Sequence, residues 1–178
     1  MKRITALTLL TALVMTAAGA GGGDTAKGKG ELDWMAFMPG MAAAKKSDKK
    51  LLVDVYTDWC GWCKRLDRDV YQNDKVSGYL KDHYVLVKLN AESSDTLRFK
   101  DKKYTQIEFA QSFGITGYPS TIFFDAKGEP VNLVPGYLPA EKYLPIFQFI
   151  AEDYYKKMSW QDYQKVRDSL QASAKKTN

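Results

Sequence analysis

The spacing of apolar residues in the first half of the chain predicts two strands joined by a helical crossover. Leu51–Tyr56 is a nearly continuous apolar run, of the kind found in strands buried on both faces. Tyr84–Leu89 alternates and is rich in β-branched residues, which predicts a second core strand. Between them, residues 60–72 place apolar side chains at helical spacing, and a short second helix runs through Leu80. The polar face of the first helix carries Lys64, Arg65, Asp67 and Arg68. This order predicts a parallel βαβ unit.

The second half of the chain predicts an antiparallel pair of strands. Ser120–Phe124 favours a strand, residues 125–128 a tight turn, and Val131–Val134 the returning strand. Before them, Thr105–Glu108 has the pattern of a capping box, which starts a helix that we expect to end at Ser112. A βαβ half followed by a ββ half predicts an α/β domain with a mixed central sheet.

The segments around this frame are predicted to be helices and one insertion. Pro39-Gly40 interrupts the apolar pattern, and a helix follows at Met41–Lys46. Ala91–Lys103 is polar and charged, which indicates a surface insertion. Residues 138–157 favour a long helix and residues 159–174 a last one, which we expect to dock on the domain through aromatic side chains. Those aromatic residues are Tyr154, Tyr155, Trp160 and Tyr163.

The N-terminus has the pattern of a secretory signal peptide. Lys2 and Arg3 precede an apolar run from Ile4 to Ala18, and Ala18 and Ala20 are small residues at the two positions that determine cleavage. The alternative is a membrane anchor, but the run is shorter than the roughly 20 apolar residues that a spanning helix needs. It is also interrupted by threonines. We therefore predict a signal peptide at residues 1–20, cleaved after Ala20, and no stable membrane insertion.

Length and composition bound the rest of the chain. Its 178 residues, 45% of them apolar, suffice for one domain with a proper core. We expect a flexible Gly- and Lys-rich leader at residues 21–30 and one domain at residues 31–178, with its core at 51–150 and a helical extension at 151–178. Export would place the protein in the periplasm or outside the cell.

The charge of the chain does not favour a nucleic-acid partner. The net charge is +5, but apart from both ends the lysines are interleaved with acidic residues, as on a solvated surface. A nucleic-acid interface would need a clustered basic patch. We expect a monomer without such a partner.

The chain has two cysteines, Cys60 and Cys63, and their context favours redox chemistry. A disulfide stabilises a fold mainly by closing a loop, and this one would close only two intervening residues. A strand that leads directly into a helix instead places Cys60 at the helix start, where free N–H groups and the helix dipole favour a thiolate. We therefore expect Cys60 to be an exposed nucleophile and Cys63, one turn inside, to be the resolving thiol.

Metal binding and hydrolysis are the rival uses of this cysteine pair. A structural zinc site takes four protein ligands, and a catalytic one takes three and a water. The chain offers two thiols and one histidine, His83, in a different segment. A Cys–His hydrolase would need that histidine beside the thiol. We expect no metal and no cofactor beyond a Cys60–Cys63 disulfide.

Several motifs form one set across the chain. Residues 59–64 read Trp-Cys-Gly-Trp-Cys-Lys, and the other members are Asp54, Lys88, Pro119 in the Gly117–Thr121 loop, and Gly136. Together they resemble the thioredoxin-fold family, whose active-site motif is similar to residues 59–64, and in particular the exported thioredoxin-like thiol–disulfide oxidoreductases of bacteria. The resemblance implies a thioredoxin fold over residues 51–150, built as βαβ plus ββα with helices on both sides of the sheet, and an extra C-terminal helix beyond it.

The resemblance also implies roles for these residues. Asp54 would be a buried acid that accepts the proton of Cys63, and Lys88 would oppose the rise that burial causes in the pKa of Asp54. Pro119 would follow a cis peptide bond that exposes the backbone of Tyr118 to an extended substrate. The remaining substrate-binding residues would be Trp59, Gly61, Trp62 and Gly136.

Two classes of function follow from these motifs. In the first, an enzyme takes electrons from a membrane thiol donor and reduces disulfides of exported proteins, while a disulfide oxidase or isomerase is the alternative within the same class. In the second, the fold is a binding module and the cysteine pair is a passive redox switch.

Overall fold

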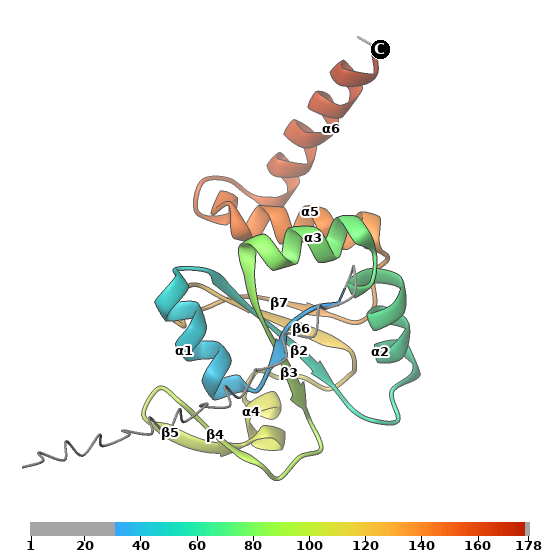
Figure 1. The fold of residues 1–178 in the computed structure, drawn as a ribbon. Helices are drawn as coiled ribbons and strands as arrows, with labels where there is room; N and C mark the ends of the chain where they lie inside the picture. The colour runs from blue at the N-terminus through green and yellow to red at the C-terminus, as the bar shows by residue number, and fades with distance from the viewer. Residues whose placement is uncertain (1–30, 177–178) are drawn as a thin grey trace, which may run out of the picture.

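The computed structural model describes residues 31–176, and a five-stranded mixed sheet forms its centre (Figure 1). The strand order is β1-β3-β2-β6-β7. The strands are β1 (Trp34–Met35), β2 (Lys50–Tyr56), β3 (Tyr84–Asn90), β6 (Ser120–Phe124) and β7 (Pro130–Pro135). β3 is parallel to both β1 and β2, whereas β6 is antiparallel to β2 and β7 is antiparallel to β6. The predicted βαβ and ββ halves are thus confirmed, and β1 is an addition that the sequence did not indicate.

Helices cover both faces of the sheet, as expected. The helices are α1 (Phe37–Ser47), α2 (Gly61–Leu66), the π-helix η1 (Asp67–Tyr71), α3 (Asp74–His83), α4 (Gln106–Ser112), α5 (Ala140–Ala151), the 3₁₀-helix η2 (Tyr154–Lys156) and α6 (Trp160–Lys176). One buried cluster joins the sheet to α2, η1, α3 and α5, and the other joins it to α1 and α4. This three-layered arrangement, with the sheet between two layers of helices, confirms the thioredoxin fold, in which buried strands read as nearly continuous apolar runs.

The register of the strands brings four chain segments to one edge of the sheet. The parallel strands β2 and β3 pair Tyr56 with Asn90 at their carboxyl ends. The antiparallel strands place Ser120, at the start of β6, opposite Val55 of β2 and Pro135 of β7. The loop before Cys60, the loop after β3, the segment before β6 and the turn after β7 therefore meet at this edge. The opposite edge holds the starts of β2, β3 and β7.

Helix α1 corrects the prediction that the helix begins at Met41, after Pro39-Gly40. The helix begins at Phe37 and runs through both residues. Pro39 lies in the first turn, where its missing N–H has no intrahelical partner to lose. A Cβ on Gly40 would lie 2.3 Å from Cγ2 of Val87, so the glycine allows the helix to pack closely on β3.

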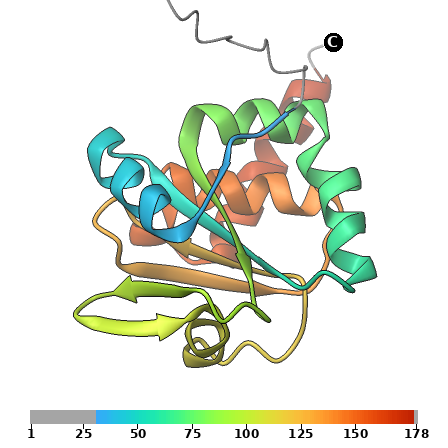
Figure 2. The same cartoon turned by 60° about the horizontal axis from the view of Figure 1, so that its bottom comes forward.

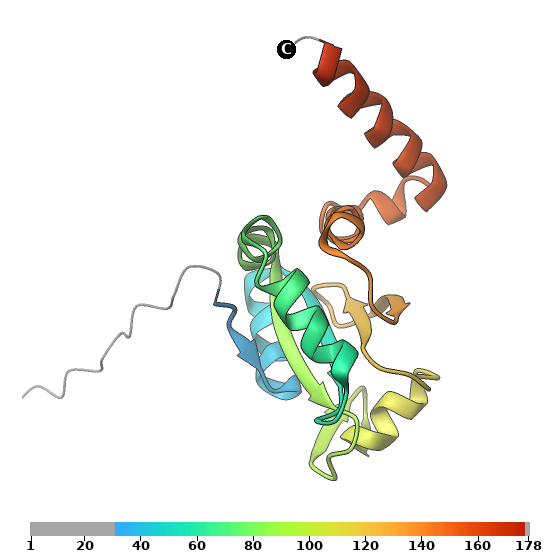
Figure 3. The same cartoon turned by 90° about the vertical axis from the view of Figure 1, so that its right-hand side faces the viewer.

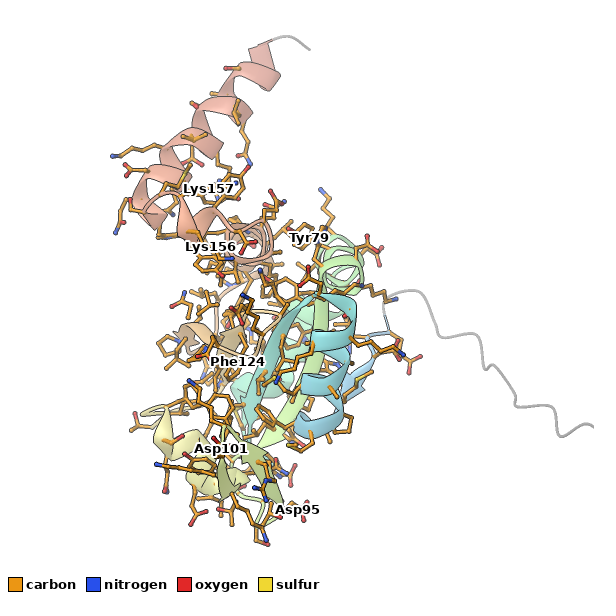
Figure 4. The ribbon with its side chains drawn as sticks, turned by 90° about the vertical axis from the view of Figure 1, so that its left-hand side faces the viewer. Tyr79, Asp95, Asp101, Phe124, Lys156 and Lys157 are labelled. Atoms are coloured by element: carbon orange, nitrogen blue, oxygen red, sulfur yellow. A yellow bond between two sulfur atoms is a disulfide. The ribbon has the colours of Figure 1, made fainter. Side chains whose placement is uncertain are left out.

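The Ala91–Lys103 segment is more ordered than the predicted polar insertion. It contains the hairpin strand β4 (Thr96–Phe99) and the start of its partner β5 (Lys102–Thr105). Figure 2 shows this hairpin in front of the sheet beside α4, and Asp95 and Asp101 mark it in Figure 4. Leu97 is buried and Phe99 packs on the same cluster as Phe124, because alternate residues of β4 face the core.

The C-terminal part corrects one prediction and confirms another. The long helix ends at Ala151, not near Lys157, because Asp153 takes a left-handed backbone conformation with φ of 58°. The aromatic residues that we expected to dock the tail all belong to, or pack against, the buried cluster that contains Phe149: Tyr154, Tyr155, Trp160 and Tyr163. Beyond its first turn, α6 projects from the domain (Figures 1 and 3).

The predicted signal peptide and leader lie outside the described residues. Within residues 31–176, no helix has the length and apolar character required to span a bilayer.

Candidate active site

Cys60 and Cys63 form a disulfide at the junction between β2 and α2. Cys60 is the N-cap of α2, and its Sγ accepts the N–H of Cys63 at 3.0 Å. A cysteine sulfur in this position receives a free helix N–H, which favours its ionised form after reduction. Both cysteines are only 3% exposed in the disulfide, so the expectation that Cys60 is exposed is wrong for this state.

Two exposed tryptophans flank the disulfide. Trp59 is 69% exposed, and its indole Nε1 donates a hydrogen bond of 2.8 Å to Glu92 from the loop after β3. Trp62 is 55% exposed, and its ring lies 5.3 Å from that of Tyr137 after β7. The guanidinium of Arg65 lies over both of these rings. Large exposed aromatic side chains around a reactive pair are typical of a surface that contacts another protein.

The loop before β6 and the turn after β7 are joined at the same edge. The peptide bond between Tyr118 and Pro119 is cis, and the Tyr118 ring contacts Trp59 at 6.3 Å between centroids. Gly136 donates its N–H to the carbonyl of Pro119 at 2.8 Å and has φ of 77°, which favours glycine. A Cβ on Gly61 or on Gly136 would meet no atom within 4 Å, so both glycines face open space.

Asp54 lies near the carboxyl end of β2, two residues before Tyr56, and is completely buried. Its Oδ2 accepts a hydrogen bond from Nζ of Lys88, the residue opposite it on β3, and its Oδ1 has no hydrogen-bond partner. Burial raises the pKa of Asp54 from 3.8 to about 6, although the nearby Lys88 ammonium opposes this rise. A carboxylate with this pKa is suited to exchange protons near neutral pH.

Asp67 is a member of this group that the sequence did not identify. We expected it on the solvated face of the helix with Lys64, but Lys88 donates to it as well as to Asp54. Asp67 follows Cys63 by four residues, and its N–H donates to the carbonyl of Cys63. The spacing of four residues puts both side chains on one helix face, and this signal could have found it.

Lys88 is partly buried and lies beside Asp54, as the family resemblance implied. Burial lowers its pKa, but the two carboxylates outweigh that effect and raise the pKa above its ordinary value. Three aromatic rings lie within 5.4 Å of its Nζ. They belong to Trp34, Tyr56 and Tyr71.

His83 lies away from the cysteines. It ends α3 just before β3, at the edge of the sheet opposite the carboxyl end of β2, and its ring stacks on Tyr79. Figure 4 marks Tyr79 on this side of the molecule. Among the residues that the structure describes, no group of three or more histidine, cysteine, aspartate or glutamate side chains could hold a metal ion.

Comparison with known proteins places this site in a family. The family model of the thioredoxin-like domain matches residues 39–151. The thiol:disulfide interchange protein DsbD of Vibrio vulnificus is 29% identical over 113 residues, which are 62% of this chain and 18% of that protein. The chain thus spans less than a fifth of the length of this curated relative.

Solved structures agree on the fold. A thioredoxin-fold protein from Helicobacter pylori has a TM-score of 0.61 at 22% identity, covering 74% of this chain and 88% of its own. A thioredoxin from Thermus thermophilus has a TM-score of 0.56 at 18% identity, covering 67% of this chain and 86% of its own. Since the family model matches more than half of the residues, the chain belongs to the thioredoxin-like domain family, and its cysteine pair is Cys60 and Cys63.

Proposed function

We propose that this protein is an exported reductase that transfers electrons to disulfides of exported proteins. Export rests on the signal-peptide pattern of residues 1–20 and would place the enzyme in the periplasm or outside the cell. A membrane thiol protein would supply the electrons, a role suggested by the likeness to a thiol:disulfide interchange protein. The reaction needs no cofactor, because the two cysteines carry both electrons.

In the proposed reaction Cys60 attacks first and Cys63 resolves. The Cys60 thiolate attacks a sulfur of the substrate disulfide, forms a mixed disulfide and releases the other substrate sulfur as a thiolate that takes up a proton. Cys63 then passes its proton to Asp54 and attacks Cys60 Sγ, so that the second substrate thiolate leaves. The substrate disulfide is reduced and the Cys60–Cys63 dithiol is oxidised. The observation that carries this order is the hydrogen bond from the N–H of Cys63 to Cys60 Sγ.

Substrate would bind across the exposed edge of the sheet. Tyr118 precedes the cis bond to Pro119, two residues before Ser120, which pairs with Val55 of β2, and an extended substrate segment could pair with the Tyr118 backbone. Trp59 and Trp62 would contact the substrate on the two sides of the disulfide, and Gly61 and Gly136 leave room for it.

The test is to trap substrates with single-cysteine variants. Cys63→Ser keeps the nucleophile and removes the resolving thiol, so a mixed disulfide should accumulate. Cys60→Ser should trap at least tenfold less, because the remaining thiol lies inside the helix and lacks the N-cap position. Both variants are expressed with the export signal, alkylated in acid and analysed on non-reducing gels with mass spectrometry. More capture by Cys60→Ser than by Cys63→Ser would contradict the order of attack.

The reduction potential of the cysteine pair tests the direction of electron flow. If the protein is a reductase, the reduction potential of the cysteine pair, measured by equilibration with glutathione, should lie well below that of the disulfide-forming oxidases. The strongest of these oxidases have potentials of about −120 mV. The matching activity is the reduction of insulin by residues 21–178 with a small thiol donor. A potential near that of the oxidases would favour the oxidase reading. Unchanged reductase activity in both cysteine variants, with no captured substrate, would favour the binding module.

A further inference from the structure

The two carboxylates of the site share one ammonium group. Lys88 Nζ lies 2.5 Å from Oδ2 of Asp54 and 2.5 Å from Oδ1 of Asp67. Exposure rises from Asp54 through Lys88 to Asp67, whose side chains are 1%, 21% and 41% exposed in that order. The three residues therefore form a continuous polar path from the buried strand β2 to the surface.

A pocket of about 320 Å³ opens at the outer end of this path. Lys88 and Asp67 line it, together with Trp34 of β1 and Tyr71 of η1. Neither cysteine belongs to its lining. The pocket is large enough to hold several waters or a small anion, so Asp54 has a polar connection to solvent other than the disulfide surface.

The elements around Lys88 supply the titratable groups that bear on this path. From β2 come Asp54 and Tyr56, with Asp58 just beyond the strand. From η1 come Asp67 and Tyr71, from α5 comes Tyr143, and from the segment before β1 comes Glu31 at the pocket. Burial raises the pKa of Tyr71 well above its ordinary value and that of Tyr143 to about 12, so both stay neutral near pH 7. Among the carboxylates named here, Asp54 and Asp67 are the two in contact with Lys88.

We propose that Asp67 is a positioning residue for the proton transfer at Asp54, because it shares Lys88 with that carboxylate and joins it to the pocket. The inference rests on the proposed function of Asp54 as proton acceptor. When Cys63 gives its proton to Asp54, the Lys88 ammonium stays between the two carboxylates, and Asp54 then releases the proton to water. The carboxylate of Asp54 is restored and the charge of Lys88 is unchanged.

The central variant is Asp67→Asn, which removes one negative charge and leaves Lys88 to Asp54 alone. The pKa of Asp54 should fall, because the negative charge of Asp67 raises it in the unaltered protein. The pH midpoint of the resolving step should fall with it. The matched control is Asp82→Asn, the same change at an exposed position of α3, which should leave both midpoints in place. Asp67→Glu keeps the charge and should restore the original midpoint.

Formate tests the connection to the pocket. In Asp67→Asn, formate can enter the pocket beside the unshared Lys88 ammonium and raise the midpoint back toward that of the unaltered protein. Citrate at equal ionic strength is too large for such a site and should not. The unaltered protein should respond to neither anion, because Asp67 already occupies the position.

Two measurements separate this inference from the proposed function. The pKa of Asp54 is followed by carbon NMR of the labelled carboxyl group in the reduced protein, without any turnover, and the resolving step is followed by stopped flow. An unchanged or raised pKa of Asp54 in Asp67→Asn overturns the role of Asp67. Equal resolving rates for Asp54→Asn and the unaltered protein at every pH would instead overturn Asp54 as proton acceptor, whatever the NMR titration of Asp67→Asn gives.

Discussion

Each end of the β2–β3 strand pair holds a lysine–aspartate pair, and burial of the carboxylate makes the two pairs different. At the start of β2, Lys50 is buried and its Nζ lies 2.8 Å from Asp153, whose side chain is 37% exposed. At the other end, Lys88 meets Asp54, whose side chain is 1% exposed. The lysines are alike, but only the second aspartate is removed from water.

The pKa values follow this difference. Burial raises the pKa of Asp153, but hydrogen bonds from Lys50 and Lys156 outweigh it and hold the pKa below its ordinary value. Burial dominates at Asp54 and raises its pKa to about 6. Asp153 therefore stays ionised and ties α5 and η2 to the sheet, whereas Asp54 can change its protonation near neutral pH. Figure 4 marks Lys156, the second partner of Asp153, near the base of α6.

The largest expected effect is that of Asp54→Asn on turnover. The resolving step should slow by about 100-fold near pH 7, the scale of general base catalysis. The loss should shrink as pH rises, because Cys63 then ionises without a base. Stopped-flow reduction of a model disulfide across pH measures both effects. Asp153→Asn serves as the control at the other end of β2 and should keep the rate within twofold.

Asp54→Asn should also be more stable to unfolding than the unaltered protein near neutral pH. A raised folded-state pKa means that ionised Asp54 is disfavoured in the fold, so Asn should add up to about 3 kcal/mol above pH 6. The gain should vanish below pH 4, where the carboxyl is protonated in both states. Lys88 keeps Asp67 as its partner. Urea unfolding at pH 4 and pH 7.5 checks this, and a loss of stability at pH 7.5 would contradict it.

A smaller effect of opposite sign is expected for Asp153→Asn. It should lower the free energy of unfolding at pH 7 by about 1 kcal/mol, because the substitution leaves Lys50 buried without its partner. The loss stays small because Asp153 is partly exposed. Asn tolerates the left-handed backbone at this position, so the change isolates the charge. Because the folded-state pKa is depressed, the difference should disappear as pH falls through it. Lys156→Met, at the exposed partner, should have a smaller effect in the same urea titration.

The smallest effect is expected for His83→Gln, directly before the start of β3 and on the same side of the sheet as Lys50. The pH profile of disulfide reduction should not move, and stability should change by less than about 0.5 kcal/mol. The measurement is the same stopped-flow series between pH 5 and pH 9. A moved midpoint would mean that the two ends of the strand pair are coupled, and the comparison would have to be abandoned.

The sequence by itself determined the strands, the cysteine pair and the family resemblance. Leu51–Tyr56, Tyr84–Leu89 and Ser120–Phe124 lie within a residue of the observed strands, because buried strands leave continuous or alternating apolar runs. The capping box at Thr105 is present as expected, since this signal is local. The prediction that the helix begins only after Pro39-Gly40 was wrong, because the close contact of Gly40 with Val87 joins residues far apart in the chain.

Only the tertiary structure decided that Asp67 belongs to the site. The resemblance to the thioredoxin-fold family already linked Lys88 to Asp54, whereas we expected Asp67 on the solvated face of its helix. The parallel register of β2 and β3 sets Lys88 opposite Asp54, and the helix after Cys63 brings Asp67 to the same ammonium. Local patterns set which elements form, but register and packing decide which side chains meet, and a pKa depends on that meeting and on burial.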